Sequence, residues 1–531
     1  MQSCVSIRAG YPMRIFATIL ISIAFAAQAL NPIIPSTGTF LCDPEGHQWA
    51  DGKLYLYGSH DIRNDQVEAW GCSNNYHVFS SSDLINWTDE GEQFTWSSVL
   101  YAPDCAYKGG TYYLYFCLTD GQEWVATSTS PKGPFTNGQQ ISGISEIDPA
   151  AFVDDDGQAY YAWGQGGHQI GRLNADMKSL SSSTIHSSIN SGNFHEGSSL
   201  DKRDGIYYLV FADGSRRGTP SCLGYGTSTT PLGPYTYRGV IIDNYGSDPG
   251  VWNNHGSIAQ FNGQWYVFYH RSSRNSVKNR RACCEKITFN ADGTIPEVPM
   301  TSQGAEGPIT ASRQMEAEIA CGLSGNARIQ DCSEGGEEIG GIQNGDYAIY
   351  RYINFGSGYS GFSARVQKQS TASAIEIRLE TSSGTLAGTC SVPAGSGWAT
   401  QTCSLSGATG THTVYLKFTG GNGSGRLNWF TFTGSTGIGN AAADHASAGV
   451  AFSIAGDRIR FSLPYLPQTR RMRLEIFDLR GNLVATPADG MTRGGAYDLP
   501  WNASPLNGAG MFAVRLTCGN EIRIANAGLV R

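Results

Sequence analysis

Five copies of one hairpin pattern recur between residues 31 and 308 of the 531-residue chain. Each copy has a turn with a glycine, followed by a strand of alternating tyrosine and aliphatic residues, as in DGKLYLYGS from Asp51 to Ser59. Successive copies are 58, 47, 48 and 58 residues apart, measured between Gly52, Gly110, Gly157, Gly205 and Gly263. Asp-Gly and Asn-Gly turns beside period-2 strands are typical of hairpins, and strand repeats of this length are typical of propellers. We therefore expect an all-β chain that begins with a five-bladed β-propeller over residues 30–308.

The composition excludes two classes of protein. Charged residues make up 15% of the chain, against about 25% in an average globular protein, and the formal net charge is −8. Nucleic-acid binders usually carry a basic surface, and disordered chains contain few aromatic residues, whereas this chain is 11% aromatic. We therefore expect a folded protein whose partner is not a nucleic acid.

The first 29 residues resemble a bacterial-type export signal. Arg8 and Arg14 precede an apolar run from Ile15 to Ala26, and Ala27-Gln28-Ala29 is a small-x-small cleavage site. The run is shorter than the roughly 20 residues of a membrane span, and no later apolar stretch is long enough. We expect a secreted or cell-surface protein with residues 1–29 removed; a buried N-terminal helix is the alternative.

The cysteine count supports this compartment. Without Cys4 the exported chain has twelve cysteines, and an even number in an exported chain is typical of disulfides. The spacing makes Cys321 with Cys332, and Cys390 with Cys403, plausible local bridges. The partner of the vicinal pair Cys283-Cys284 stays open.

Three carboxylates precede the turn glycines at one constant distance. Asp43, Asp148 and Glu196 each lie nine residues before the glycine of their own copy, whereas Asp104 lies six and His255 eight residues before theirs. Equivalent positions of this kind are expected on the innermost strands, which line the propeller axis. A single Asp-Pro pair is more typical of a turn, but unpaired carboxylates in one register are costly to bury without a role. We expect them to converge in one pocket.

Converging carboxylates suit glycoside hydrolysis. That reaction needs one protonated carboxylic acid for the leaving oxygen and one carboxylate that activates water or attacks. A third carboxylate raises the pKa of its neighbour, because like charges disfavour ionisation. Tryptophans could stack on sugar faces, although each is also a candidate core residue: Trp49, Trp70, Trp124 and Trp163. Trp70 and Trp124 are our candidates for substrate contacts.

These motifs together resemble glycoside hydrolase family 43 over about 280 residues. The resemblance rests on short phrases around Asn31-Pro32, Asp43-Pro44, Ile147-Asp148-Pro149, His195-Glu196-Gly197 and Asn254-His255-Gly256. It implies a five-bladed propeller that inverts the anomeric centre, with Asp43 as general base, Glu196 as general acid, and Asp148 tuning and orienting the acid.

The same resemblance implies further site residues. His255 matches a histidine near the propeller axis that in relatives helps bind a calcium ion or a water cluster, and it is also our candidate for a substrate contact. Arg281, or its neighbour Arg280, matches an arginine that contacts substrate or the tuning carboxylate. A sialidase propeller is the competing assignment, but the Asp-containing turn after Ser81 lacks the usual glycine, and the carboxylate register has no counterpart there.

The sequence pattern changes after Pro308. Residues 313–435 show short alternating strands with frequent turns, as in a β-sandwich, and resemble carbohydrate-binding module family 6. The resemblance implies a sugar held between two aromatic rings and an asparagine, here Trp398, Asn428 and the candidate Tyr347, although Gly341 stands where some relatives carry an aromatic. Glu316 and Glu318 resemble ligands of a structural calcium ion, or else form a solvated strand face.

Two segments remain. A linker over 436–449 leads to a small C-terminal β-sandwich over 450–531, which resembles the sorting or attachment domains of some secreted bacterial proteins. An accessory sandwich without that role is the alternative.

These features lead to one functional hypothesis and several competitors. We expect an inverting glycosidase that releases α-L-arabinofuranosyl groups from arabinoxylan, acts as a monomer on a polysaccharide or oligosaccharide, and needs no cofactor for its chemistry. On the same scaffold, β-xylosidase, endo-arabinanase and galactofuranosidase activities share the three carboxylates. A non-catalytic glycan-binding protein and a surface adhesin are alternatives of a different kind.

Overall fold

The computed structural model describes residues 30–34, 39–62 and 72–434, together with strands between residues 453 and 528. The predicted export signal and the linker over 436–449 lie outside the described residues. The chain divides into two compact units, one comprising residues 27–441 and the other containing the C-terminal strands. No helix of the described residues is long and apolar enough to cross a membrane.

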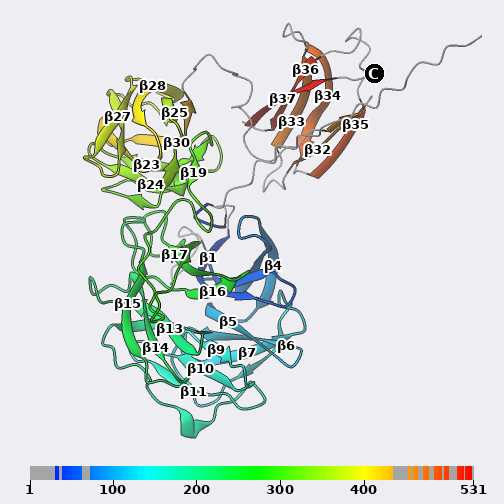
Figure 1. Cartoon of the computed structure of the whole chain (residues 1–531), viewed down its shortest axis with the longest axis vertical. Helices are drawn as coiled ribbons and strands as arrows, with labels where there is room; N and C mark the ends of the chain where they lie inside the picture. Colours follow the sequence, from blue (N-terminus) through cyan, green and yellow to red (C-terminus); the bar gives the residue numbers. More distant parts are fainter. Residues whose placement is uncertain are drawn as a thin grey trace, which may run out of the picture. The chain divides into compact units, whose positions relative to one another are not determined.

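The predicted propeller is confirmed as five antiparallel sheets, which Figure 1 shows in blue to green. The innermost strands β1, β5, β9, β12 and β16 contact one another in sequence, and β1 contacts β16 to close the ring. The blades are β1 (Phe40–Gln48), β2 (Leu54–Asp61), β3 (Asn75–Ser81) and β4 (Trp87–Thr95); β5 (Leu100–Lys108), β6 (Thr111–Leu118), β7 (Glu123–Ser128) and β8 (Thr136–Gln140); β9 (Ala150–Val153), β10 (Ala159–Trp163) and β11 (Gln169–Arg172); β12 (Phe194–Arg203), β13 (Ile206–Asp213), β14 (Cys222–Ser228) and β15 (Thr236–Asp243); and β16 (Ser257–Phe261), β17 (Gln264–Arg271) and β18 (Arg281–Ile287).

The repeated sequence pattern accounts for the blade geometry. All five turn glycines have positive φ values, between 79° and 86°, and each connects an innermost strand to the second strand of its blade. A residue with a Cβ atom rarely adopts this conformation. One tyrosine from each copy is fully buried, and these rings belong to apolar clusters that join neighbouring blades: Tyr57, Tyr115, Tyr161, Tyr208 and Tyr269. Burial of such rings is the main source of stability between the sheets.

The N-terminal segment closes the ring. The amide of Ile33 donates to the carbonyl of Ala282 on β18, and the Asn31 side chain bonds to the backbone of Cys284. Ile33 and Ile34 then pack with residues of the first and last blades in one cluster. The first and last parts of the propeller sequence are therefore held together by hydrogen bonds as well as by apolar contact.

The predicted β-sandwich follows directly. Two six-stranded sheets enclose a single apolar cluster that includes Tyr350, Phe362 and Phe430. One sheet contains β19 (Ile309–Thr310), β21 (Gly322–Leu323), β24 (Tyr347–Asn354), β26 (Ser373–Leu379), β27 (Thr385–Val392) and β29 (Thr411–Gly420). The other contains β20 (Met315–Glu316), β22 (Arg328–Asp331), β23 (Glu337–Ile342), β25 (Tyr359–Gln367), β28 (Trp398–Ala408) and β30 (Gly425–Gly434).

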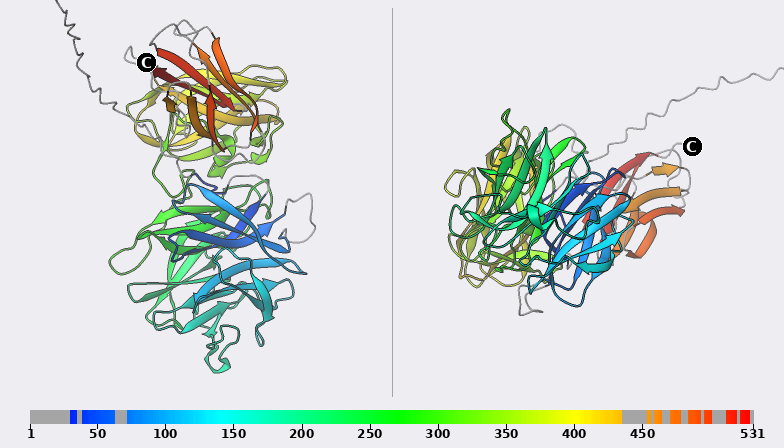
Figure 2. Two further views of the ribbon diagram at one scale, coloured as in Figure 1. Left: turned by 90° about the vertical axis from the view of Figure 1, so that its right-hand side faces the viewer. Right: turned by 90° about the horizontal axis from the view of Figure 1, so that it is seen from below.

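Short 3₁₀ turns occur at Ser182–Thr184 (η1) and Ala317–Ile319 (η2). The C-terminal unit has two sheets, drawn in orange and red in Figure 2, as expected for a small sandwich. Its strands are β31 (Ser453–Ala455), β32 (Arg458–Leu463), β33 (Arg470–Phe477), β34 (Leu483–Thr492), β35 (Gly495–Pro500), β36 (Met511–Cys518) and β37 (Glu521–Gly528).

Both predicted disulfides are wrong. The eleven cysteines whose side chains the structure describes are all free thiols. Cys321 is buried in the cluster between the fourth and fifth blades, and its thiol donates to the carbonyl of Ile349 rather than meeting Cys332. Cys390 and Cys403 do lie together, but as two thiols joined by a hydrogen bond. Cys283 and Cys284 are both fully buried on β18 and point into different clusters.

Candidate active site

A pocket of about 220 Å³ in the propeller contains all three predicted carboxylates, Asp43, Asp148 and Glu196. Each is 4–5% exposed. Asp43 and Glu196 lie where the ladders of β1 and β12 are interrupted by β-bulges, and Asp148 lies just before β9. Bulges redirect side chains at the ends of strands, and positive φ values of 50° at Asp43 and 63° at Asp148 mark the same local distortion.

Asp43 is held as a carboxylate by a dense set of donors. The guanidinium Nη1 of Arg280 lies 2.7 Å from Oδ1, and the Ser59 hydroxyl donates to Oδ2 at 2.6 Å. Burial by itself would raise the pKa of Asp43, but Arg280, with His270 and His255, lowers it well below its ordinary value. Asp61 in turn binds Arg280 through Nε and Nη2, both at 3.0 Å, which fixes the guanidinium.

Asp148 has the opposite electrostatic environment. Burial raises its pKa well above the ordinary value, and the neighbouring charges of Glu196 and Asp43 raise it further. Glu196 accepts hydrogen bonds from Gln165 at 2.8 Å and from Asn253 at 3.2 Å. One site therefore contains a carboxylate that is held ionised, Asp43, and a second, Asp148, whose ionisation is disfavoured.

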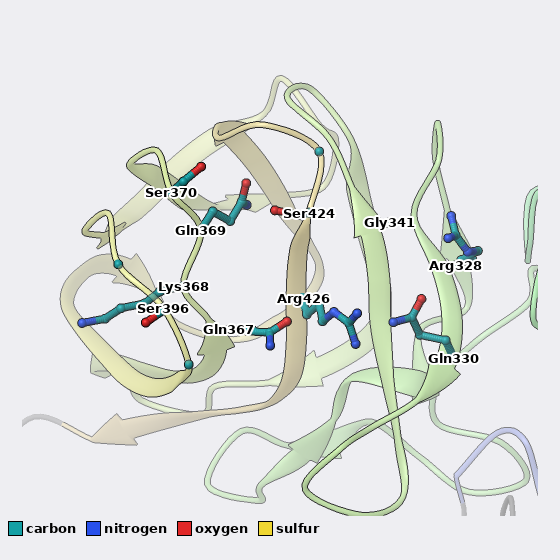
Figure 3. Close-up of a pocket in the computed structure, with 13 residues that line it drawn as sticks. Arg328, Gln330, Gly341, Gln367, Lys368, Gln369, Ser370, Ser396, Ser424 and Arg426 are labelled. Carbon is teal, nitrogen blue, oxygen red and sulfur yellow. The ribbon is translucent and has the colours of Figure 1, made fainter.

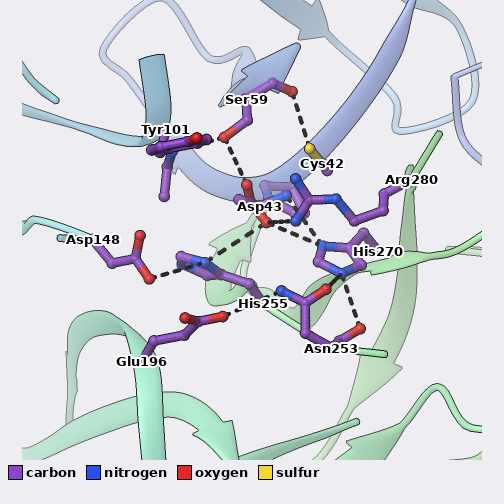
Figure 4. Close-up of polar contacts among 12 residues, drawn as sticks. Cys42, Asp43, Ser59, Tyr101, Asp148, Glu196, Asn253, His255, His270 and Arg280 are labelled. Carbon is purple, nitrogen blue, oxygen red and sulfur yellow. Dashed lines mark hydrogen bonds and ion pairs between the residues drawn. The ribbon is translucent and has the colours of Figure 1, made fainter. Parts of the chain in front are cut away.

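His255 lies between the two kinds of carboxylate, as Figure 4 shows. Its Nδ1 is 3.7 Å from Asp43 Oδ1 and 3.8 Å from Asp148 Oδ2. Burial lowers its pKa, which favours the neutral ring. A side chain larger than hydrogen at residue 197 would press on this ring, because a Cβ atom there would lie 3.0 Å from it. Gly197, next to Glu196, thus allows the histidine to reach the site.

The structure corrects two predicted substrate contacts. Arg280, not Arg281, reaches the pocket; Arg281 is turned away and binds Glu337 on β23 of the sandwich. Trp124 lies on β7 and packs against Trp96 in the cluster between the first two blades, because its strand position faces that apolar layer. Trp70 lies outside the described residues.

Other aromatic residues line the pocket instead. Tyr101 and Trp252 take part in the lining, and the Trp252 ring lies edge-on to His195 at 5.7 Å. The sequence could have pointed to both, because Tyr101 lies three residues before Asp104 and Trp252 lies three residues before His255. Trp163 is buried in a cluster between blades, and Trp49 stacks on His47.

Asp104 has a different task from the three carboxylates of the pocket. Its Oδ1 lies 2.7 Å from His47 Nε2, and its Oδ2 accepts from the amide of Ala151 on the next blade at 2.6 Å. It therefore links two blades. Glu45, His47 and Asp104 form one of two groups of potential metal ligands found in the described residues; the other is Cys42, Asp61 and Cys72.

The predicted calcium positions fit unequally. His255 belongs to neither of these two groups, and its calcium role stays a prediction; the carboxylate oxygens near its Nδ1 are those of Asp43 and Asp148. In the sandwich, Glu318 keeps one buried carboxylate oxygen without a hydrogen-bond partner. Burial, with Glu316 and Glu337 nearby, raises its pKa. An unpaired buried oxygen beside another carboxylate fits a hard cation.

The predicted sugar clamp of the sandwich is divided between its two sheets. Trp398 on β28 donates to the Ser333 hydroxyl at 2.9 Å, and Asn428 on β30 donates to Glu334 at 3.2 Å. Tyr347 lies on β24 of the other sheet, where its ring contacts Tyr415. The structure brings Trp398 and Asn428 to one sheet but not Tyr347, because the two strands at Tyr347 and Trp398 belong to different layers.

Comparison with known proteins agrees with the division of the chain into a propeller and a sandwich. The family model "Glycosyl hydrolases family 43" matches residues 29–295, and "Carbohydrate binding module (family 6)" matches residues 316–434. An arabinoxylan arabinofuranohydrolase of Bacillus subtilis is 31% identical over 420 residues, covering 65% of this chain and 80% of that protein. Xylosidase/arabinosidase 43A of Humicola insolens is 30% identical over 334 residues, covering 50% and 98%.

A solved structure is also similar to the chain. It is a family 43 arabinoxylan arabinofuranohydrolase from Bacillus subtilis in complex with cellotetraose, 29% identical, with a TM-score of 0.46, covering 76% of this chain and 97% of that one.

Proposed function

The chain belongs to glycosyl hydrolase family 43 and is a hemicellulose-degrading glycosidase, and from this premise we propose that it releases α-L-arabinofuranosyl groups from arabinoxylan with inversion. The observation that supports the proposal is the convergence of Asp43, Asp148 and Glu196 in one small pocket with opposite electrostatic environments. Relatives named arabinoxylan arabinofuranohydrolase favour arabinose as the released sugar.

Asp43 is the general base in this mechanism. Arg280 and Ser59 keep it ionised and fix both of its oxygens, so it accepts a proton from a water molecule that attacks the anomeric carbon. In an inverting enzyme this water must fit between the base and the sugar.

Glu196 is the general acid. Burial and the charges of Glu196 and Asp43 raise the pKa of Asp148, and we assign the transferred proton to the Glu196 carboxyl. That proton passes from Glu196 to the leaving oxygen as the glycosidic bond breaks. Gln165 and Asn253 donate hydrogen bonds to the Glu196 carboxyl and orient it.

The proposal includes export and a structural calcium ion. A polymeric substrate is too large to enter a cell, which agrees with the export signal predicted in residues 1–29. In the sandwich, Glu316 and Glu318 would hold the calcium ion, which would neutralise the unpaired oxygen of Glu318. Cell fractionation tests the first point, and loss of thermal stability on chelation tests the second.

The deciding experiment is chromatography of the sugars released from arabinoxylan, linear arabinan and xylo-oligosaccharides, with Glu196→Gln as the inactive control. Free arabinose from arabinoxylan is expected, and proton NMR of the first product should show the inverted anomer. Release of xylose or of arabino-oligosaccharides would overturn the substrate, and a retained anomer would overturn the mechanism.

A further inference from the structure

The sandwich contains a second, larger pocket of about 470 Å³. It lies over the strands β22, β23, β25 and β30 and the loops that follow Gln367 and precede Trp398 (Figure 3). Of the described residues that line it, three are cationic and none is acidic or aromatic. This composition differs from that of the whole chain, whose net charge is −8. A local positive field in a negatively charged protein favours an anionic ligand.

The three cations are spread across the pocket. Figure 3 shows Lys368 on one side, Arg328 on the other, and Arg426 between them. Neither Arg328 nor Lys368 forms an ion pair within the part of the chain that the structure describes. Arg426 is 37% exposed in its side chain and is paired at 2.8 Å with the buried Glu338. Two charges are therefore uncompensated, and the third is anchored.

The backbone makes room for one of these cations. Gly341 has a φ of 66°, and a Cβ atom at this position would lie 2.4 Å from Nη1 of Arg328. Any side chain here would displace the guanidinium. Gly341 stands where some relatives carry an aromatic ring, and its lack of a side chain allows Arg328 to lie beside the pocket.

Neutral hydrogen-bonding groups occupy the space between the cations. Gln330 donates to Glu338 at 2.7 Å, and Gln369 accepts from the amide of Asn422 at 2.8 Å, so both side chains are held in place. Trp398 lies directly opposite Gln367 in the strand pairing, which puts a partly buried aromatic residue next to the pocket. Amides with a neighbouring aromatic face suit sugar hydroxyls and a sugar ring.

We propose that this pocket binds a hemicellulose chain that carries uronic acid groups, with the sugar carboxylate held by Arg328, Lys368 and Arg426. Arginine matches carboxylate geometry with paired donors, and charge-assisted hydrogen bonds are stronger than neutral ones. The sandwich therefore selects acidic stretches of the polymer. This role does not depend on which bond the propeller cleaves.

The test compares two ligands that differ in one group. Binding of the full-length Glu196→Gln chain to a xylo-oligosaccharide with a glucuronic acid branch is measured by calorimetry, beside the same oligosaccharide with its carboxyl reduced to a hydroxymethyl group. At low salt we expect the acidic ligand to bind at least about tenfold more tightly, and the difference to shrink as salt rises. Equal affinity for the two ligands would overturn the proposal.

Variants locate the effect. Arg328→Gln with Lys368→Gln should abolish the preference, whereas Lys417→Gln, which removes a cation from β29 of the other sheet, should leave it unchanged. A preference that survives the double variant places the carboxylate elsewhere and contradicts the proposal. If the double variant does not fold, the comparison of the two ligands on the parent chain still decides the question. A sulfated oligosaccharide that binds as tightly as the acidic one would show a general anion site and reject the carboxylate assignment.

Discussion

The propeller pocket and the sandwich pocket are both lined by polar side chains, but their charges are arranged in opposite ways. In the propeller, buried carboxylates predominate and are balanced by Arg280 within hydrogen-bonding distance. In the sandwich, half-exposed cations lie apart, and only Arg426 has a buried partner. Burial makes charges interact strongly enough to shift pKa values, whereas exposed charges are screened. The first arrangement suits proton transfer, and the second suits recognition of a charged polymer.

The strands that build the two pockets also differ. The carboxylates of the propeller come from three different blades and are brought together by closure of the ring. The cations of the sandwich come largely from neighbouring strands of one sheet and their loops. Loss of one blade contact would therefore disturb the first pocket more than loss of one loop contact would disturb the second. Four predictions test this contrast, in order of expected effect.

Glu196→Gln should separate chemistry from binding. We expect kcat to fall about 10²–10⁴-fold or more, because the leaving oxygen loses its proton donor, while binding to the sandwich stays unchanged. The matched control is Glu285→Gln, a buried carboxylate that does not line the pocket and whose pKa is raised to about 8 by burial. Steady-state kinetics check both variants. Near-normal kcat in Glu196→Gln would contradict the assignment.

Glu337→Leu tests whether the two domains of residues 27–441 are independent. Glu337 is 3% exposed and binds Arg274 and Arg281 of the propeller. Removing one partner of a buried ion pair leaves uncompensated charge, so we expect a loss of about 3–5 kcal/mol in the free energy of unfolding, measured in urea. The control is Glu380→Ala, whose exposed pair with His412 should contribute no more than about 1 kcal/mol. Equal effects would show that the interface ion pairs do not stabilise the protein.

Arg280→Met should shift the pH dependence of the propeller pocket. Asp43 acts only when ionised, so activity is present above its pKa and is lost below it. Since Arg280 lowers that pKa against the effect of burial, its removal should move the acidic limb of kcat/KM to higher pH, by about one to three units. Arg216→Met, which removes an arginine bound to Glu297 outside the pocket, serves as control. An unmoved acidic limb would exclude Arg280 as the group that holds Asp43 ionised.

The smallest effect concerns the aromatic residues. Trp252→Ala should raise KM up to about tenfold, because it removes an aromatic side chain from the pocket lining. Trp124→Phe should leave KM unchanged, since this ring packs between blades and does not line the pocket. A rise in KM for Trp124→Phe alone would restore the contact predicted from the sequence and remove the one drawn from the structure.

Repeats were the most informative part of the sequence. The five turn glycines predicted the number of blades, because a left-handed turn residue is a local requirement that recurs once in each copy. The constant nine-residue offset placed Asp43, Asp148 and Glu196 together for the same reason. Local rules of this kind need no knowledge of distant contacts.

Single residues without a repeat were predicted poorly. Arg280 and Arg281 are adjacent on the chain, and only the packing of the sandwich against the propeller determines which one turns to Asp43 and which to Glu337. Trp124 and Trp252 have no sequence pattern that separates a core ring from one that lines a pocket. The bonding state of Cys321 could not be predicted either, because residues of the propeller that are distant in the sequence bury its thiol.

The sequence by itself therefore determined the all-β class, the five blades, the sandwich and the register of the three carboxylates, because turn conformation and strand period are local properties. Only the tertiary structure decided which side chains surround those carboxylates, why Asp43 and Asp148 differ in pKa, and where the sandwich gathers its cations. Electrostatic environment and burial are sums over residues that are far apart in the chain, so they are defined only once the sheets have packed.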